Sequence, residues 1–211
     1  MAFQKYIAPI QYSDKGYSTK DRWVSYSWQT KLVKSVAPQG RVLEIGVGNG
    51  VVASFLSGTH TVETVDINAE LRPTHVGSVE RLDFLQPESF DAVLCAEVLE
   101  HLPYAQFDSC LKELQRVSKN FIILSLPYWG NTFGIRLRMP VLGTRTLKWK
   151  LTGYKPHTFN GQHYWEIGKR GYPVWKIKQA IRRAGFEINK SFWDLDDAYH
   201  YYFVLSKRHA E

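Results

Sequence analysis

The segment that most constrains the fold of this chain is a glycine-rich turn between two short apolar runs. The first run, Arg41–Ile45, is typical of a buried β-strand, and the second, Val51–Leu56, fits a short helix. Between them lie Gly46, Gly48 and Gly50. Glycines let the backbone turn tightly and let another molecule approach it closely. A strand, a tight turn and a helix in this order predict a parallel βαβ unit with a ligand crevice at the carboxyl end of the strand.

Further strands are predicted on both sides of this unit. Apolar and β-branched runs indicate strands at residues 60–66, 75–78, 90–95, 121–126, 186–193 and 199–205. The last two are joined by a short acidic turn that begins at Asp194, so they must be antiparallel. We therefore predict an α/β fold, a doubly wound and mainly parallel seven-stranded sheet with an antiparallel C-terminal hairpin.

Helical periodicity fills the intervals between the strands. It predicts helices over residues 18–36, with Ser18 or Thr19 as N-cap, over 106–117, and from Pro173 to a cap at Gly185. The 211 residues fit one domain, 1–211. Cys95 and Cys110 lie in apolar stretches, which favours buried, reduced thiols. With no leader pattern and no long apolar segment, a cytoplasmic location is expected.

The net charge of +7 is concentrated in one segment. Residues 127–163 contain no Asp or Glu and six basic side chains, which are Arg136, Arg138, Arg145, Lys148, Lys150 and Lys155. Such a patch attracts an anionic partner, which can be a nucleic acid, a phosphorylated small molecule or a membrane surface. The alternative is a solvated loop whose charge only aids solubility.

An acidic side chain accompanies the glycine turn. Asp66 ends the next strand, twenty residues past Gly46, where a carboxylate can accept hydrogen bonds from both ribose hydroxyls of an adenosine. In a dinucleotide fingerprint the third glycine would stand at Val51, but here it comes one residue early, at Gly50. This spacing disfavours a nicotinamide dinucleotide.

Two motifs carry a family resemblance. Residues 42–50 (VLEIGVGNG) resemble motif I of class I S-adenosylmethionine-dependent methyltransferases. Residues 90–102 (FDAVLCAEVLEHL) resemble the fourth-strand motif of the ubiquinone-biosynthesis-like branch, also called methyltransferase type 11, and Ala184-Gly185-Phe186 also fits. The resemblance is close over residues 32–126 and loose over 171–205. It implies a Rossmann-like fold and S-adenosyl-L-methionine as cofactor.

The same resemblance implies a set of cofactor contacts. Glu44 would reach the amino group of the cofactor, Asp66 would hold the ribose hydroxyls, and Ile67 would lie beside the adenine. Ser78 and Val79 would border the adenine, although many relatives carry Asp where this chain has Ser78. The remaining contacts implied are Gly46, Gly48, Asn49 and Gly50, near the methionine and ribose, and Cys95 and Ala96, near the sulfonium.

For the chemistry, His101 is the first candidate for a general base, because an imidazole titrates near neutral pH. Alternatively, it packs the loop before Pro103. Glu97, Glu100 and His101 also resemble the metal ligands of small-RNA 2′-O-methyltransferases, with His157 or His163 completing the set. We favour the base and predict no metal site.

The loop at residues 157–166 is expected to close over the methyl acceptor. Within it, His163 is a second catalytic candidate, and Tyr164 and Trp165 are candidate acceptor contacts or core residues. Tyr6, Tyr12, Tyr17 and Trp23 could form an N-terminal lid over the sulfonium. In this arrangement, residues 1–38 are the helical lid and residues 127–170 are a basic insertion over the acceptor site.

The predicted function is methyl transfer to an oxygen or nitrogen of a small or saccharide-like acceptor, which can be anionic. One alternative is a tRNA or small-RNA methyltransferase that uses the basic insertion. Another is a non-catalytic cofactor-binding module. The sequence predicts a small-molecule partner first and RNA second, with no transmembrane segment, and leaves the oligomeric state open.

Overall fold

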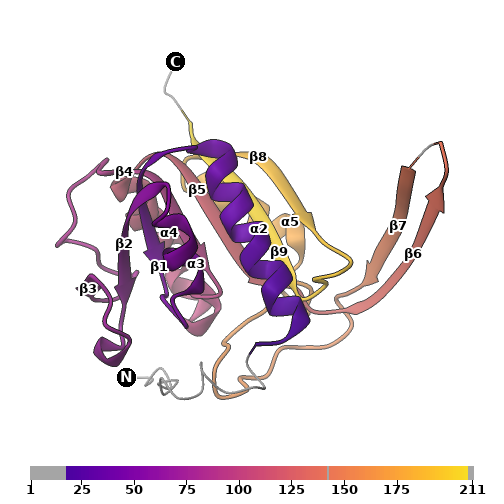
Figure 1. Cartoon of the computed structure of the whole chain (residues 1–211). Helices are drawn as coiled ribbons and strands as arrows, with labels where there is room; N and C mark the ends of the chain where they lie inside the picture. The colour runs from indigo at the N-terminus through magenta and orange to yellow at the C-terminus, as the bar shows by residue number, and fades with distance from the viewer. Residues whose placement is uncertain (1–17, 142, 209–211) are drawn as a thin grey trace.

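The computed structural model describes residues 18–141 and 143–208, and they form a doubly wound α/β sheet (Figure 1). Seven strands lie in the order β3-β2-β1-β4-β5-β9-β8. Their bounds are β1 Gly40–Ile45, β2 His60–Asp66, β3 His75–Val76, β4 Phe90–Ala96, β5 Ser118–Pro127, β8 Phe186–Trp193 and β9 His200–Lys207. The first five strands are parallel, and β9 pairs antiparallel with both β5 and β8. The predicted fold class is confirmed.

Within the described residues, four α-helices cover the two faces of the sheet (Figure 1). They are α2 (Lys20–Val36), α3 (Val51–Leu56), α4 (Phe107–Val117) and α5 (Val174–Arg183). The apolar side chains of α2 and α3 pack on one face in a cluster with Val42 and Leu94, while those of α4 and α5 pack on the other with Leu43 and Val93. No helix in the described ranges is long and apolar enough to span a membrane.

Most element boundaries agree with the sequence prediction to within a few residues, with three differences. Strand β3 ends at Val76, so Ser78 lies in the loop beyond it. Strand β5 begins at Ser118, before the apolar run that marked it, because Ser118 already pairs with Phe90 of β4. Pro173 is the N-cap of α5 and not its first helical residue.

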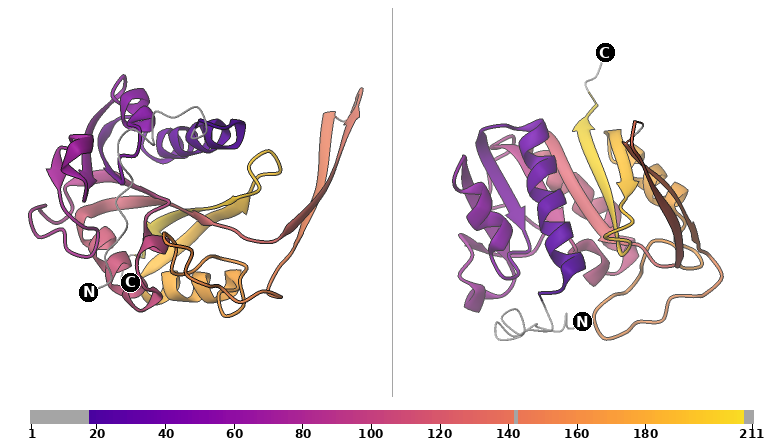
Figure 2. Two further views of the ribbon diagram at one scale, coloured as in Figure 1. Left: turned by 90° about the horizontal axis from the view of Figure 1, so that it is seen from below. Right: turned by 45° about the vertical axis from the view of Figure 1, so that its right-hand side comes forward.

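The basic insertion forms a β-hairpin, which the sequence prediction did not include. Strands β6 (Asn131–Met139) and β7 (Gly143–Leu151) pair antiparallel along their whole length and form a sheet of their own. Figure 2 shows this hairpin, which we call the arm, projecting from the rest of the molecule. Both of its faces are largely exposed, and it contacts the domain near its base and along the β8–β9 turn.

Candidate active site

A cavity of about 440 Å³ opens at the carboxyl ends of β1, β2 and β4. The order of the sheet reverses between β1 and β4, and doubly wound sheets bind ligands at such a point. The residues of the predicted site that line this cavity are Glu44, Gly46, Gly48, Asn49, Asp66, Ile67, Ser78, Val79, Ala96, His101 and His163. Gly50 caps the start of α3, and Cys95 is fully buried in the core, so neither belongs to this lining.

The glycine turn is shaped by a backbone that requires glycine. Gly46, Gly48 and Gly50 all have positive φ angles, of 83°, 55° and 70°. At Gly46 the space is also closed, because an added Cβ would lie 2.5 Å from Cγ2 of Val98. The turn therefore depends on glycine at position 46 for both conformation and packing.

Asp66 is fixed at the end of β2 by backbone groups. Its Oδ2 accepts a hydrogen bond of 2.9 Å from the Val47 N–H, and its Oδ1 accepts one of 2.8 Å from the Asn68 N–H. The carboxylate thereby joins the glycine turn to the loop after β2. A carboxylate held in this way is preorganised to accept further hydrogen bonds from a ligand in the cavity.

Glu44 is a buried carboxyl group in the cavity wall. Burial, with a smaller contribution from the charge of Asp66, raises the pKa of Glu44 from 4.5 to about 8, although a hydrogen bond from the Ala53 backbone acts in the opposite direction. One of its oxygens, Oε2, has no hydrogen-bond partner among the described residues. Glu44 is therefore mostly protonated at neutral pH and has an oxygen available for a ligand.

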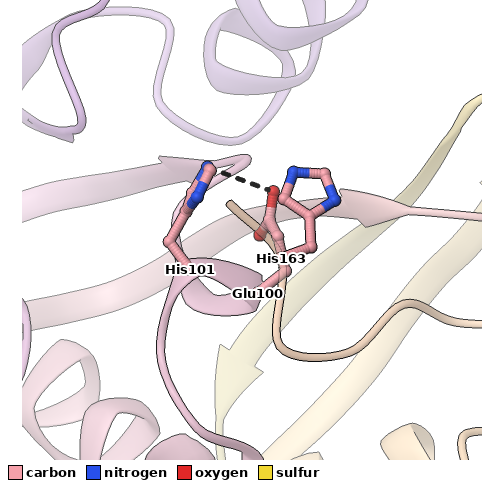
Figure 3. Close-up of side chains that lie close together, drawn as sticks. All are labelled: Glu100, His101 and His163. Carbon is pink, nitrogen blue, oxygen red and sulfur yellow. Dashed lines mark ion pairs between the residues drawn. The ribbon is translucent and has the colours of Figure 1, made fainter. Parts of the chain in front are cut away.

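Glu100, His101 and His163 form a compact cluster (Figure 3). A ligand atom from each lies within 4.8 Å of the others. The Nδ1 of His101 lies 3.1 Å from the carbonyl oxygen of Gln162, which favours the tautomer that donates from Nδ1. Its Nε2 is then the unprotonated atom, 4.0 Å from Oε1 of Glu100.

The pKa values of Glu100 and His101 in this cluster are both shifted so that the neutral forms are favoured. Burial, and then the charge of Glu97, raises the pKa of Glu100 well above its ordinary range. Burial, and then His163, lowers the pKa of His101 from 6.5 to about 4. Both oxygens of Glu100 are buried without a partner among the described residues. A buried carboxyl without partners is costly, so this cluster is suited to a ligand that supplies them.

Two further residues considered for the same metal site have other hydrogen-bond partners. Glu97 accepts a hydrogen bond of 2.9 Å from the Ser125 hydroxyl, and His157 Nε2 lies 2.8 Å from the carbonyl oxygen of His163. The structure thus brings Glu100, His101 and His163 together. Glu97 lines the same cavity next to Glu100 but is not part of this cluster, and His157 does not line the cavity.

The aromatic candidates have mixed positions. Trp165 is fully buried and donates a hydrogen bond of 3.1 Å to the carbonyl oxygen of Leu102, so it is a core residue. Tyr164 packs against Phe159. Trp23 is 52% exposed, and its neighbour Tyr26 lines the cavity in its place. Tyr6, Tyr12 and Tyr17 lie outside the described residues.

Sequence reasoning missed a buried ionic group on the far wall of the cavity. His200 begins β9, and its Nδ1 lies 2.5 Å from Oδ1 of Asp197, while its Nε2 lies 3.7 Å from Oε2 of Glu97. Asp197 also accepts a hydrogen bond from the Tyr202 hydroxyl. Burial lowers the pKa of His200, but the charge of Glu97 and the hydrogen bond to Asp197 outweigh it, so the pKa is raised above 6.5.

Four further lining residues, Arg22, Ser25, Tyr26 and Gln29, come from one side of α2. Their spacing of three to four residues indicates that they share one face of the helix. The sequence prediction used only the apolar residues of this helix and so missed that polar face. No spacing in the sequence connects Asp197 and His200 to Glu97. Their contact arises because β9 is inserted next to β5.

Comparisons with known proteins agree with this geometry. Residues 43–121 match the family model described as a methyltransferase domain. Over 81 residues the chain is 36% identical to the ubiquinone biosynthesis O-methyltransferase of Xanthomonas campestris. The match covers 31% of this chain and 34% of that protein. The chain thus spans about a third of the length of these curated relatives.

Solved structures show the same fold over nearly the whole chain. The 1,6-didemethyltoxoflavin-N1-methyltransferase of Burkholderia thailandensis, solved with S-adenosylhomocysteine, has a TM-score of 0.63 at 15% identity, covering 97% of this chain and 92% of that one. An amino pentose methyltransferase from Micromonospora echinaspora, solved with S-adenosylmethionine, has a TM-score of 0.62 at 13% identity, covering 98% and 100%.

The sheet order, the glycine turn and the match over residues 43–121 are together similar to those of class I S-adenosylmethionine-dependent methyltransferases, as the two sequence motifs predicted. Two of the similar structures were solved with S-adenosylmethionine or S-adenosylhomocysteine bound.

Proposed function

We propose that this protein transfers a methyl group from S-adenosylmethionine to an oxygen or nitrogen of a small acceptor. The observation that carries the proposal is the continuity of the cavity. The glycine turn, Glu44 and Asp66 line one part of it, and His101, His163 and His200 line another. A cofactor held by the first group would present its methyl group toward polar side chains able to position an acceptor.

The size of the cavity supports a small acceptor. A volume of about 440 Å³ is within the usual range for small-molecule sites, and the cofactor occupies part of it. Arg22 and His200, whose pKa is raised, line the same space, which is compatible with an anionic acceptor. The names of the similar proteins point in the same direction, toward a quinone precursor, a toxoflavin precursor and an amino pentose.

The role of the cluster follows from its electrostatics. A general base works best with a pKa near the operating pH, and a pKa of about 4 makes His101 a weak proton acceptor. Glu100, Nε2 of His101 and His163 instead fit a divalent cation, which would supply the partners that Glu100 lacks. Such a cation would lower the pKa of an acceptor hydroxyl. We therefore propose the cation role ahead of the base role.

A chelator experiment distinguishes the two roles. With a cation, chelation abolishes turnover, Mg²⁺ or Mn²⁺ restores it, and His101→Ala lowers the bound metal as well as the rate. With a base, chelation changes little and the rate rises with pH through the pKa of His101. His75→Ala is the matched control, because His75 lies on β3 and does not line the cavity. An active His101→Ala enzyme that is insensitive to chelator would exclude both roles.

The proposed activity itself is tested by binding and turnover. Calorimetry should show micromolar binding of S-adenosylmethionine and none of NAD. A screen for cofactor consumption across metabolite pools and total RNA should then give turnover with a small molecule. Binding without any turnover would favour the non-catalytic module. Turnover on RNA that falls steeply with salt would favour the nucleic-acid alternative.

A further inference from the structure

The two faces of the arm differ sharply in chemistry. In the register of β6 and β7, Phe133 pairs with Trp149 and Ile135 pairs with Leu147, so that alternate residues of both strands share one face. That face carries only one charged residue, and its large apolar side chains are Phe133, Ile135, Leu137, Leu147, Trp149 and Leu151. The opposite face carries Arg136, Arg138, Lys148 and Lys150.

Two side chains of the basic face already contact the domain. Arg136 forms an ion pair of 2.7 Å with Asp196, and Lys150 donates a hydrogen bond of 2.7 Å to the carbonyl oxygen of Tyr128. Gly134 lets the arm approach the β8–β9 turn, because an added Cβ there would lie 2.6 Å from Cδ1 of Leu195. These contacts fix the basic face to the domain at a few side chains, although most of that face stays exposed, and the apolar face lies on the opposite side of the hairpin.

The apolar face has no cover within the described residues. Its six large side chains are between 45% and 65% exposed, and the rings of Phe133 and Trp149 stack on each other at 5.7 Å. A hairpin of two strands is marginally stable in water on its own, and a continuous apolar strip of this kind marks an interaction surface. The apolar face of the arm is therefore a candidate surface for binding a partner.

A second copy of the chain does not suit this surface. Arg145 lies on the apolar face, opposite Leu137, and residues 131–151 contain no Asp or Glu. Packing two arms face to face would bury Arg145 without an acidic partner from either arm, which is strongly unfavourable. The charge of +7 on each chain adds repulsion.

Along the arm, the order of apolar and basic residues at its free end matches the order of layers in a lipid surface. Val141 is 93% exposed at the turn between the strands, and Arg138 and Arg145 follow on either side of it. Among the described residues, neither arginine has an ion-pair partner. An apolar end followed by arginines and an aromatic pair matches acyl chains below anionic phosphates. The unpaired edges of a two-stranded sheet exclude spanning, so the arm would lie in the headgroup region.

We propose that the arm is a docking device for an anionic lipid surface, with its apolar face and Val141 immersed at the level of the headgroups. The docked surface would lie against the arm and leave the cavity of the domain intact. The proposal is independent of the acceptor, so it holds or fails separately from the proposed methyl transfer.

Co-sedimentation of the full chain with lipid vesicles tests the proposal. Vesicles of phosphatidylcholine and phosphatidylglycerol in equal parts should bind the protein, vesicles of phosphatidylcholine alone should not, and added salt should weaken binding. Phe133→Ser with Trp149→Ser should weaken binding by at least about tenfold. Arg145→Gln should weaken it by about fivefold, the effect of one basic residue near such a surface.

Matched controls come from exposed residues elsewhere. Phe55→Ser with Trp175→Ser removes two aromatic side chains that are 68% and 66% exposed on helices, and Arg182→Gln removes one exposed charge. These variants should bind vesicles as the unchanged protein does. Quenching of Trp149 fluorescence by brominated lipids, lost in Trp149→Phe, should place that side chain in the bilayer interface.

Three results would overturn the proposal. The first is unchanged protein that stays in the supernatant with anionic vesicles. The second is equal loss of binding in the arm variants and the control variants. The third is an oligomer in sedimentation velocity that the Phe133→Ser and Trp149→Ser variant converts to a monomer, which would make the face an interface between copies. Cofactor binding by every variant confirms that it is folded.

Discussion

At the scale of single residues, Glu44 combines a raised pKa with a position in the cofactor cavity. Pairing with the ammonium group of S-adenosylmethionine requires the ionised carboxylate, whereas the free protein at pH 7 holds the proton. We therefore expect cofactor binding at pH 7 to release about one proton from the wild-type protein and none from Glu44→Gln. Calorimetry in buffers of different ionisation enthalpy measures this number. Equal release from both proteins would contradict the pairing.

Asp66 gives a second prediction for the cofactor. Asp66→Ala should weaken S-adenosylmethionine binding by about 1.5–3 kcal/mol, the range for hydrogen bonds to a charged group. Asp91→Ala is a matched control, because Asp91 also accepts a backbone hydrogen bond, from Arg41, and does not line the cavity. Wild-type affinity in folded Asp66→Ala protein would show that the ribose is held elsewhere.

His200 predicts a pH dependence of stability. Its pKa in the folded protein is raised above the ordinary 6.5, so its contribution is fully present below pH 6.5 and is lost as pH rises through the raised value. The free energy of unfolding should therefore fall with rising pH more steeply in the wild type than in His200→Gln. Denaturant titrations between pH 6 and 9 measure both slopes. Parallel slopes would show that His200 is not charged in the folded state.

At the scale of elements, the parallel strands and their helices were predictable because burial imposes their patterns. Strand β4 is a continuous apolar run from Ala92 to Ala96, since helices cover both faces of the sheet there, and α4 has one apolar stripe. The glycine turn and Asp66 were also predictable, because their spacing in the sequence is local. The alternation of Phe133, Ile135 and Leu137 is also a strand pattern, but no buried neighbour supports it, and the charge of the segment equally suited a solvated loop.

The arm should be separable from the domain. Its contacts with the rest of the protein lie near its base and along the β8–β9 turn. Replacing residues 131–151 by a short Gly/Ser linker should leave S-adenosylmethionine affinity within about twofold, since none of the replaced residues lines the cavity. Calorimetry checks the affinity. Loss of the folded state on deletion would show that the arm supports the domain.

At the scale of the whole molecule, the candidate site unites parts of the chain that local patterns do not connect. The glycine turn and Asp66 come from the first third of the chain, whereas His163 and His200 come from the last third. The sequence predicted the glycine turn and Asp66, and it also gave His163 as a catalytic candidate, but it did not indicate His200. The position of His200 depends on the global order of the sheet, in which β9 lies between β5 and β8.

This strand order also has a consequence for biosynthesis. Strand β9 is the last of the described strands to leave the ribosome, yet it lies inside the sheet and carries both the edge strand β8 and one wall of the cavity. Until it emerges, β5 keeps an open apolar edge, which is a template for pairing with other chains. Nascent chains that stop at Tyr199 should therefore aggregate or recruit chaperones, although they already contain the whole glycine turn.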